Sequence, residues 1–314
     1  MNYENQKVLT KEIAEAAINS KSNLSHYTRI EDAAAECLTI YDRGWRLDLS
    51  GLTEISDDAA ESLGKVWHNM SLSGLTSLSD AAAKSLSYHV HDLDLSGLAG
   101  WSDSAAESLS KRMQGFLSLN GLMELSESAA QSLSRYNDNF SVSGLTILSD
   151  SAAESLSKHK FVKFGCVQSD LRFDALTSLS DVAAESLSKF EGRTLTFNGL
   201  TSLSDSAAES FSKYKGNIRF STLGNLSDAG AESLSKFQGG SLNLDGLTEI
   251  SDEAAESLSK FEGSTLTFVG LSSLSDAAAE SLSNFQGYLS IDSILDPNPK
   301  SKELQAKIDS FKDG

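Results

Sequence analysis

A pattern of 23 or 24 residues recurs along most of this chain, and its clearest copy runs from Leu242 to Lys260 (LNLDGLTEISDEAAESLSK). One step between copies is longer, at 31 residues. An internal period of this length indicates a solenoid or a propeller, in which each repeat buries its apolar face against its neighbours. The copies begin at Leu47, Met70, Leu93, Leu117, Phe140, Leu171, Leu195, Ile218, Leu242 and Leu266, with a truncated copy from Leu289 and a degenerate copy over Ile30–Leu38.

The first part of each repeat predicts a short strand. In the clearest copy Leu242 and Leu244 alternate with Asn243 and Asp245, which is the period-two pattern of a half-buried strand. A glycine follows in most copies and marks the tight turn off the strand. We expect the leucines to face the core and the polar residues to face outward.

The second part, SDxAAESLSK, predicts a helix. Ser251 is placed to cap the free N–H groups, and Asp252 lies at the positive end of the helix dipole. A helical projection puts the following residues on the inward side: Ala254, Ala255, Leu258 and Phe261. Glu and Lys four residues apart face outward in seven copies, from Glu61–Lys65 to Glu256–Lys260. The recurring Asp could instead form a calcium ladder, but helix dipoles account for it.

The repeats predict one elongated domain with a cap at each end. Residues 1–23 form the N-terminal helical cap, with Val8, Leu9, Ile13, Ala16 and Ala17 on one helix face. Residues 24–295 form the solenoid, and residues 296–314 form a C-terminal capping helix with Leu304, Ile308 and Phe311 on one side. Capping is needed because a terminal repeat otherwise leaves its core open to water.

An insertion of about eight residues near 159–169 interrupts the repeats, and it carries a basic and aromatic cluster of Lys160, Phe161, Lys163 and Phe164 together with His159. Insertions in repeat proteins map to loops, often on a binding face. The alternative is an irregular turn whose two phenylalanines cover the core beneath it. Both interpretations remain open.

The formal net charge of −18 argues against partners that demand clustered Lys and Arg, namely nucleic acid and anionic membranes. No apolar run reaches the ~20 residues of a transmembrane helix, so we expect no membrane insertion. The N-terminus lacks the apolar segment of a secretory signal. Localisation is therefore unknown: cytoplasmic by default, and extracellular or at the surface if a signal has been removed.

The two cysteines are expected to be unbridged thiols. Cys37 and Cys166 occupy different positions of repeats that lie far apart in the proposed stack, so a disulfide between them would break the stack.

The strand motif LDLSGL followed by ISDDAA resembles the leucine-rich repeat family, in its bacterial type, over roughly residues 24 to 295. Leu52, Leu75 and Leu247 stand near where many members carry an Asn, which departs from the family pattern. The resemblance implies an α/β fold: a right-handed solenoid, a horseshoe or arc with an inner parallel sheet and outer helices. It also implies a protein-binding scaffold that uses its concave sheet face.

Catalysis needs a nucleophile with a base, a pocket carboxylate pair or a metal, and no such motif is present. His68, His89, His91 and Asp92 are the one constellation to weigh, because His68 and His91 share a repeat position and two stacked imidazoles could bind a transition metal. Exposed loop histidines explain them equally simply. We therefore expect no enzyme activity, no metal and no cofactor.

The outward strand positions are small and polar, apart from two arginines. We expect a site for another protein to run from the insertion across the sheet, with the protein a monomer or weakly self-associating. The candidate residues are Lys160, Phe161, Lys163, Phe164, Arg172, Asp174, Thr196, Asn198, Arg219 and Ser221. The alternatives are a structural or surface-display solenoid without a ligand, and a binder of a polar polymer such as a glycan.

Overall fold

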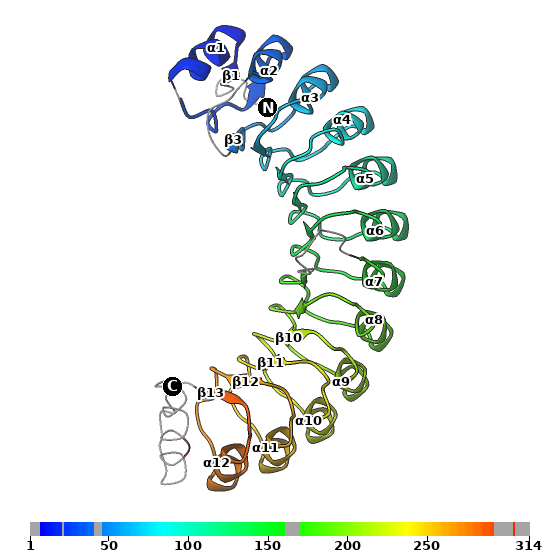
Figure 1. The fold of residues 1–314 in the computed structure, drawn as a ribbon, viewed down its shortest axis with the longest axis vertical. Helices are drawn as coiled ribbons and strands as arrows, with labels where there is room; N and C mark the ends of the chain where they lie inside the picture. Colours follow the sequence, from blue (N-terminus) through cyan, green and yellow to red (C-terminus); the bar gives the residue numbers. More distant parts are fainter. Residues whose placement is uncertain (1–6, 21, 41–45, 161–169, 292–303, 305–314) are drawn as a thin grey trace. The chain divides into compact units, whose positions relative to one another are not determined.

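The computed structural model describes residues 7–20, 22–40, 46–160, 170–291 and 304. The chain divides into two compact units. Unit 1 comprises Met1–Leu145 with His159–Val167, and unit 2 comprises Thr146–Lys158 with Gln168–Gly314. Each unit is an α/β stack of strand and helix repeats, which confirms the predicted fold class (Figure 1).

Unit 1 begins with a short strand and a ten-residue helix and then alternates strands with helices along the stack (Figure 1). Its elements are β1 (Val8–Leu9), α1 (Lys11–Ser20), β2 (Arg29–Ile30), α2 (Asp32–Leu38), β3 (Arg46–Asp48), α3 (Asp57–Leu63), β4 (Asn69–Ser71), α4 (Asp80–Leu86), β5 (Leu93–Asp94), α5 (Asp103–Ser110), β6 (Leu117–Ser118), α6 (Glu127–Ser134) and β7 (Phe140–Ser141).

Unit 2 repeats the same alternation and ends, within the described residues, on a four-residue strand. Its elements are α7 (Asp150–Ser157), β8 (Asp170–Arg172), α8 (Asp181–Leu187), β9 (Thr194–Thr196), α9 (Asp205–Ser212), β10 (Asn217–Arg219), α10 (Asp228–Ser235), β11 (Ser241–Asn243), α11 (Asp252–Ser259), β12 (Thr265–Phe268), α12 (Asp276–Ser283) and β13 (Tyr288–Ile291).

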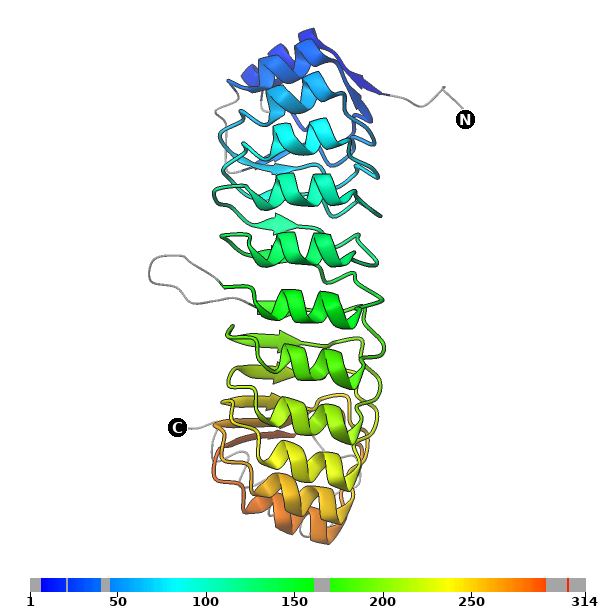
Figure 2. The ribbon, with the colours of Figure 1, turned by 90° about the vertical axis from the view of Figure 1, so that its right-hand side faces the viewer.

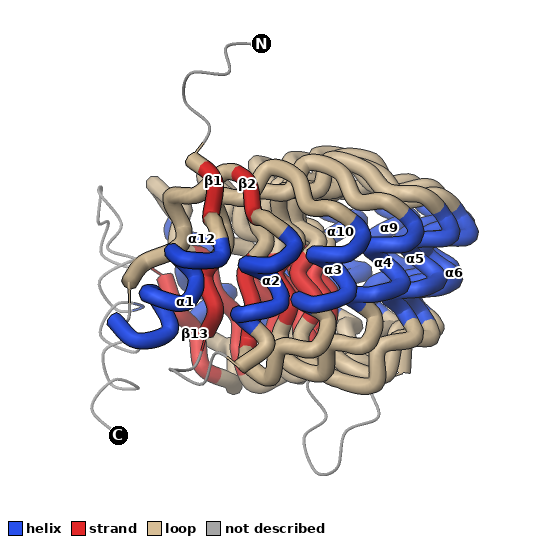
Figure 3. The backbone as a smooth tube through the Cα atoms, turned by 90° about the horizontal axis from the view of Figure 1, so that it is seen from above, coloured by secondary structure: helices blue, strands red, loops and turns tan. Residues whose placement is uncertain are grey.

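The strands of each unit pair in parallel and in sequence order. Strands β3 to β7 form a five-stranded sheet in unit 1, and β8 to β13 form a six-stranded sheet in unit 2. The register places the repeat starts opposite one another, for example Leu47 against Met70 and Leu266 against Leu289. In each unit the helices form a separate layer from the strands (Figures 2 and 3). The predicted copies, including the truncated one, are therefore confirmed.

The helices follow the predicted division into faces. In α11, Ala254, Ala255 and Leu258 are completely buried, and Phe261 just beyond the helix is 3% exposed. The outer face carries the seven predicted Glu–Lys ion pairs, such as Lys260 Nζ at 2.9 Å from Glu256 Oε1. These side chains are mostly in water, so each pair contributes little to stability. In this repeat the helix therefore contributes two alanines and a leucine to the core.

In most of the described repeats a serine cap joins the helix to the preceding helix, in a way that the sequence reasoning did not predict. The cap hydroxyl of α11, Ser251, accepts a hydrogen bond from Ala254 N at 3.0 Å and donates one to Asp228 of the preceding helix. The same relay recurs within unit 1 from Ser56 to Ser126 and within unit 2 from Ser180 to Ser275. The aspartate column is thus an acceptor row for the serine caps as well as a complement to the helix dipoles.

The glycines after the strands are required by close packing between repeats. A Cβ on Gly74 would lie 2.3 Å from the carbonyl oxygen of Ser50, and no left-handed φ occurs at this position. Thr222 stands at the equivalent site of its repeat and instead donates a hydroxyl hydrogen bond to Asn198 O at 2.6 Å. Close stacking of the repeats, rather than a left-handed turn, therefore accounts for the glycine at this position.

The N-terminal cap combines the predicted helix with a short strand before it. Val8 and Leu9 form β1, which pairs in parallel with β2, and α1 begins only at Lys11. In α1 the buried residues are Ala14 and Ala17, whereas the predicted Ala16 is exposed. A strand forms because β2 offers a free edge, which a helical pattern in the sequence does not reveal. The C-terminal capping helix predicted over 296–314 lies outside the described residues, apart from the buried Leu304.

Candidate functional site

The sheet face of unit 2 brings together the candidate residues of β8, β9 and β10. The register aligns Arg172 with Thr196 and Thr196 with Arg219. Because neighbouring strands lie ~4.8 Å apart, the backbones of the two arginines are about 10 Å apart. The alternate residues of these strands, such as Leu171 and Ile218, are buried beneath the sheet.

A hydrogen-bonded row links three repeats on this face. Arg172 donates through Nε and Nη2 to Asp174 Oδ2, at 3.2 and 3.1 Å. Asn198 Nδ2 donates to Asp174 Oδ1 at 2.7 Å, and Ser221 Oγ donates to Asn198 Oδ1 at 2.6 Å. The row holds four of the candidate side chains in fixed positions before any partner arrives.

Arg219 and Thr196 lie beside this row but differ in how far their side chains are exposed to a partner. Arg219 is exposed and forms no ion pair with any described residue. Thr196 is only 5% exposed, between the two long arginine side chains, and so offers little contact surface. Among the described residues of these strands, Arg219 is therefore the exposed cation that no carboxylate pairs.

The insertion is described only at its first residues. His159 is 3% exposed and packs edge-on against Phe140, with ring centroids 4.9 Å apart, so it belongs to the core of unit 1. Burial lowers the pKa of His159. Lys160 is exposed and belongs to unit 1. Phe161, Lys163 and Phe164 lie outside the described residues, so the binding-loop interpretation stays a prediction.

The position three residues after the last apolar residue of each helix holds a column of stacked side chains. In unit 2 this column is aromatic: Phe190, Tyr214, Phe237, Phe261 and Phe285. Ring centroids lie 5.8 Å apart between Phe237 and Phe261, and 6.0 Å apart between Phe261 and Phe285. Stacked rings of this kind join one repeat to the next.

Unit 1 fills the same column with mostly polar residues, namely Val66, His89, Arg112, Tyr136 and His159. Arg112 is completely buried, and it donates through Nε to His89 O at 3.1 Å and through Nη2 to His91 O. Burial is the main reason that the pKa of Arg112 is lowered. The guanidinium thus secures the loop of the preceding repeat, in place of a stacked ring.

Tyr136 has the same function one repeat later. Its hydroxyl donates to Gly115 O, and burial raises its pKa to about 12. Gly115 has a φ of 95°, in the left-handed region that favours glycine, and its N–H donates to Asp138 Oδ2 at 2.9 Å. Polar side chains and backbone therefore stabilise each other along this part of unit 1.

His89 is the member of the column whose ring nitrogens lack hydrogen-bond partners. Its side chain is completely buried, and neither ring nitrogen has a hydrogen-bond partner of good geometry. Burial, followed by the nearby Arg112 charge, lowers the pKa of His89 to about 4, while the backbone at Asp92 and Val66 offsets part of the shift. The ring is therefore neutral at neutral pH.

The histidine constellation considered from the sequence does not assemble a metal site. His91 packs edge-on against Trp67 with ring centroids 5.0 Å apart, and the rings of His89 and His91 are 6.2 Å apart. Within the described residues, no group of three or more His, Cys, Asp or Glu side chains could hold a metal ion. The sequence does hold a signal for the buried column: in each repeat its member stands three residues after the last apolar residue of the helix. Pairing His68 with His91 by repeat position did not use that signal.

The described residues were also compared with the requirements of a membrane span and of a disulfide. Across the described part of the chain, no helix is both long and apolar enough to cross a membrane. Cys37 is a free thiol, and Cys166 lies outside the described residues.

Comparison with known proteins gives structural likenesses only. No model of a protein family matches the sequence, and no curated protein matches it. An internalin (inlF) from Listeria monocytogenes is 16% identical, with a TM-score of 0.46, over 87% of this chain and 82% of that chain. A structure of the Rad7 and Elc1 complex in yeast is 15% identical, with a TM-score of 0.38, over 92% of this chain and 86% of that chain.

Both likenesses have a TM-score below 0.5, so the architecture rests on the chain's own repeats. Each repeat places a strand with alternating large apolar residues in a parallel sheet, turns at a glycine or a small residue, and returns through a helix. Each unit of this chain therefore has the architecture of a leucine-rich-repeat solenoid.

Proposed function

We propose that the protein is a non-enzymatic scaffold that binds another protein through the sheet face of unit 2. Arg219 carries this proposal, because it is an exposed guanidinium without an ion-pair partner among the described residues. Arginine is enriched among the residues that dominate protein interfaces. Its planar fork suits a carboxylate on the partner.

The hydrogen-bonded row beside Arg219 supports the proposal. Asp174, Asn198 and Ser221 are held by one another at 2.6 to 2.7 Å. A partner that binds these groups would therefore order few new side chains, which lowers the entropic cost of binding. The insertion near 159–169, most of which belongs to unit 1, is proposed separately as a binding loop.

Arg219→Glu tests this function, with Lys213→Glu on the outer helical face as the matched charge reversal. The immobilised full chain captures partners from the source cell, and quantitative mass spectrometry compares the variants. We expect a partner retained by wild type and Lys213→Glu and reduced about tenfold or more on Arg219→Glu. Equal capture by all three chains would contradict the proposal, and the absence of an enriched protein would favour a solenoid without a ligand.

A further inference from the structure

Unit 1 carries a groove between the C-terminal parts of α4 and α5 that differs from its equivalent in unit 2. The groove has a volume of about 520 Å³, and Tyr88, Val90 and Met113 supply its apolar side chains. Tyr88 is 70% exposed and Met113 is 80% exposed. Large apolar groups gathered at one place on a surface mark an interaction site more often than scattered ones do.

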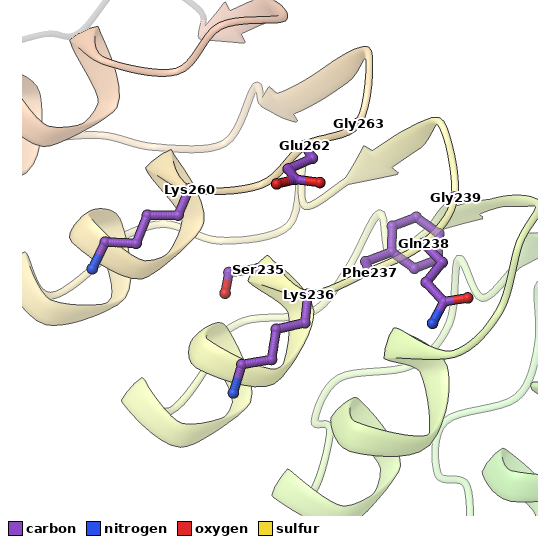
Figure 4. A pocket seen from close by; sticks show the side chains of 8 residues that line it. All are labelled: Ser235, Lys236, Phe237, Gln238, Gly239, Lys260, Glu262 and Gly263. Carbon is purple, nitrogen blue, oxygen red and sulfur yellow. The ribbon is translucent and has the colours of Figure 1, made fainter.

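The equivalent groove in unit 2, with a volume of about 700 Å³, is an internal control (Figure 4). Lys236 and Gln238 there take the positions of Tyr88 and Val90, and Glu262 takes the position of Met113. The fold therefore accepts polar side chains at all three positions. Stability of the stack does not require the apolar residues of unit 1.

The charge of the unit 1 groove also departs from the repeat pattern. Lys84 lines it at the position where most helices carry Glu, and Lys84 makes no ion pair among the described residues. Lys111 is neutralised by Glu107, with 2.8 Å between Nζ and Oε1. The groove thus presents one uncompensated cation in a chain of net charge −18.

The loop under this groove is held rigidly from within. The buried Arg112 binds the carbonyl groups of His89 and His91, on either side of Val90. Trp67, at the position of Val90 in the preceding repeat, is 68% exposed and packs edge-on against His91. Exposed apolar side chains therefore occur at Trp67, Tyr88 and Met113, in three successive repeats.

We propose that this groove docks a segment of a partner protein that presents an apolar side chain beside a carboxylate. The apolar side chain packs between Tyr88 and Met113, and the carboxylate pairs with Lys84. Tyr and Met suit this role, since aromatic residues dominate interfaces and Met adapts to the shape of its partner. This surface is separate from the sheet face of unit 2, so either proposal can fail alone.

The test uses a displayed library of random peptides selected on the full chain. The counter-target is the Tyr88→Lys/Met113→Glu chain, which copies the unit 2 groove. We expect enriched peptides that pair an aromatic or aliphatic residue with Asp or Glu. Fluorescence anisotropy of one such peptide should give a Kd at least about tenfold weaker for the double variant.

The Lys84→Glu variant separates the contribution of the Lys84 charge to peptide affinity from that of the apolar contact. It should weaken the acidic peptide about tenfold and favour the same peptide with its carboxylates changed to Lys. Lys236→Glu, in the unit 2 groove, should leave both affinities unchanged. Circular dichroism and urea midpoints matching wild type confirm that each variant is folded.

Three outcomes would overturn the proposal. One is the failure of selection to enrich any peptide, and another is enrichment of peptides that bind the double variant equally or lack acidic residues. The third is a wild-type dimer in sedimentation that becomes a monomer in the double variant, because the groove's occupant would then be a second copy of this chain.

Discussion

At the residue scale, one position of the repeat shows most clearly how the two units differ. Three residues after the last apolar residue of the helix, unit 2 stacks rings such as Phe237 and Phe261, whereas unit 1 buries His89 and Arg112. The sequence shows these identities but not their burial, because a polar side chain beyond a helix usually faces water. Burial follows from the close stacking of the loops.

His89→Phe tests the burial of this histidine. The pKa of His89 is lowered to about 4, below its ordinary value of 6.5, so the unfolded chain binds more protons between these values. Stability should therefore fall as pH drops through that window, by at most about 2 kcal/mol between about pH 7 and about pH 5. Urea unfolding across this range should show the slope in wild type and a weaker one in His89→Phe.

The control for this experiment is His26→Gln, which changes a histidine outside the column. It should keep the wild-type dependence on pH. An unchanged slope in His89→Phe would contradict the assignment of the proton uptake to His89.

At the scale of the element, the sequence predicted the helix starts well, because serine caps and aspartates act locally. It did not predict the serine to aspartate relay between helices, because that contact depends on the spacing of neighbouring repeats. For the same reason it grouped Val8 and Leu9 with the residues of the helical pattern, where the structure has a strand paired with β2. Local signals define an element only where no neighbour competes for its backbone.

Ser204→Ala measures the strength of one cap and its relay. Ser204 accepts from Ala207 N at 3.0 Å and donates to Asp181, so the variant loses both hydrogen bonds. We expect a loss of about 1 to 2 kcal/mol in the free energy of unfolding. Ser206→Ala, an exposed change in the same helix, should cost less than about 0.5 kcal/mol. Equal losses in urea denaturation would show that the relay adds nothing.

At the scale of the whole molecule, each unit is a row of repeats, and each repeat is stabilised by its contacts with the repeats next to it. In unit 2 the stacked rings continue from Tyr214 to Phe285. The sequence predicted the repeats and their order, and the chain divides into two compact units. That division depends on contacts between repeats, which a repeat pattern does not specify.

Phe237→Ala should show this coupling between neighbours. Phe237 is 3% exposed, and its removal should cost about 3 to 5 kcal/mol through lost burial and an unfilled cavity. Hydrogen exchange should lose protection first in α9 to α11, and less in repeats farther away. Gln238→Ala, at an exposed neighbouring residue, should leave the exchange unchanged. A uniform loss of protection throughout the chain would contradict nearest-neighbour coupling.

The sequence alone determined the repeat, the strand register, the helix caps and the outward Glu–Lys pairs, because each depends on a period or on residues within one turn of helix. It also identified Arg219 as a candidate for binding. Only the tertiary structure showed that Thr196 is buried, that Arg172 is already paired, and that Tyr88 and Met113 line one groove. These properties depend on which side chains from neighbouring repeats meet, and the period within one repeat does not contain that information.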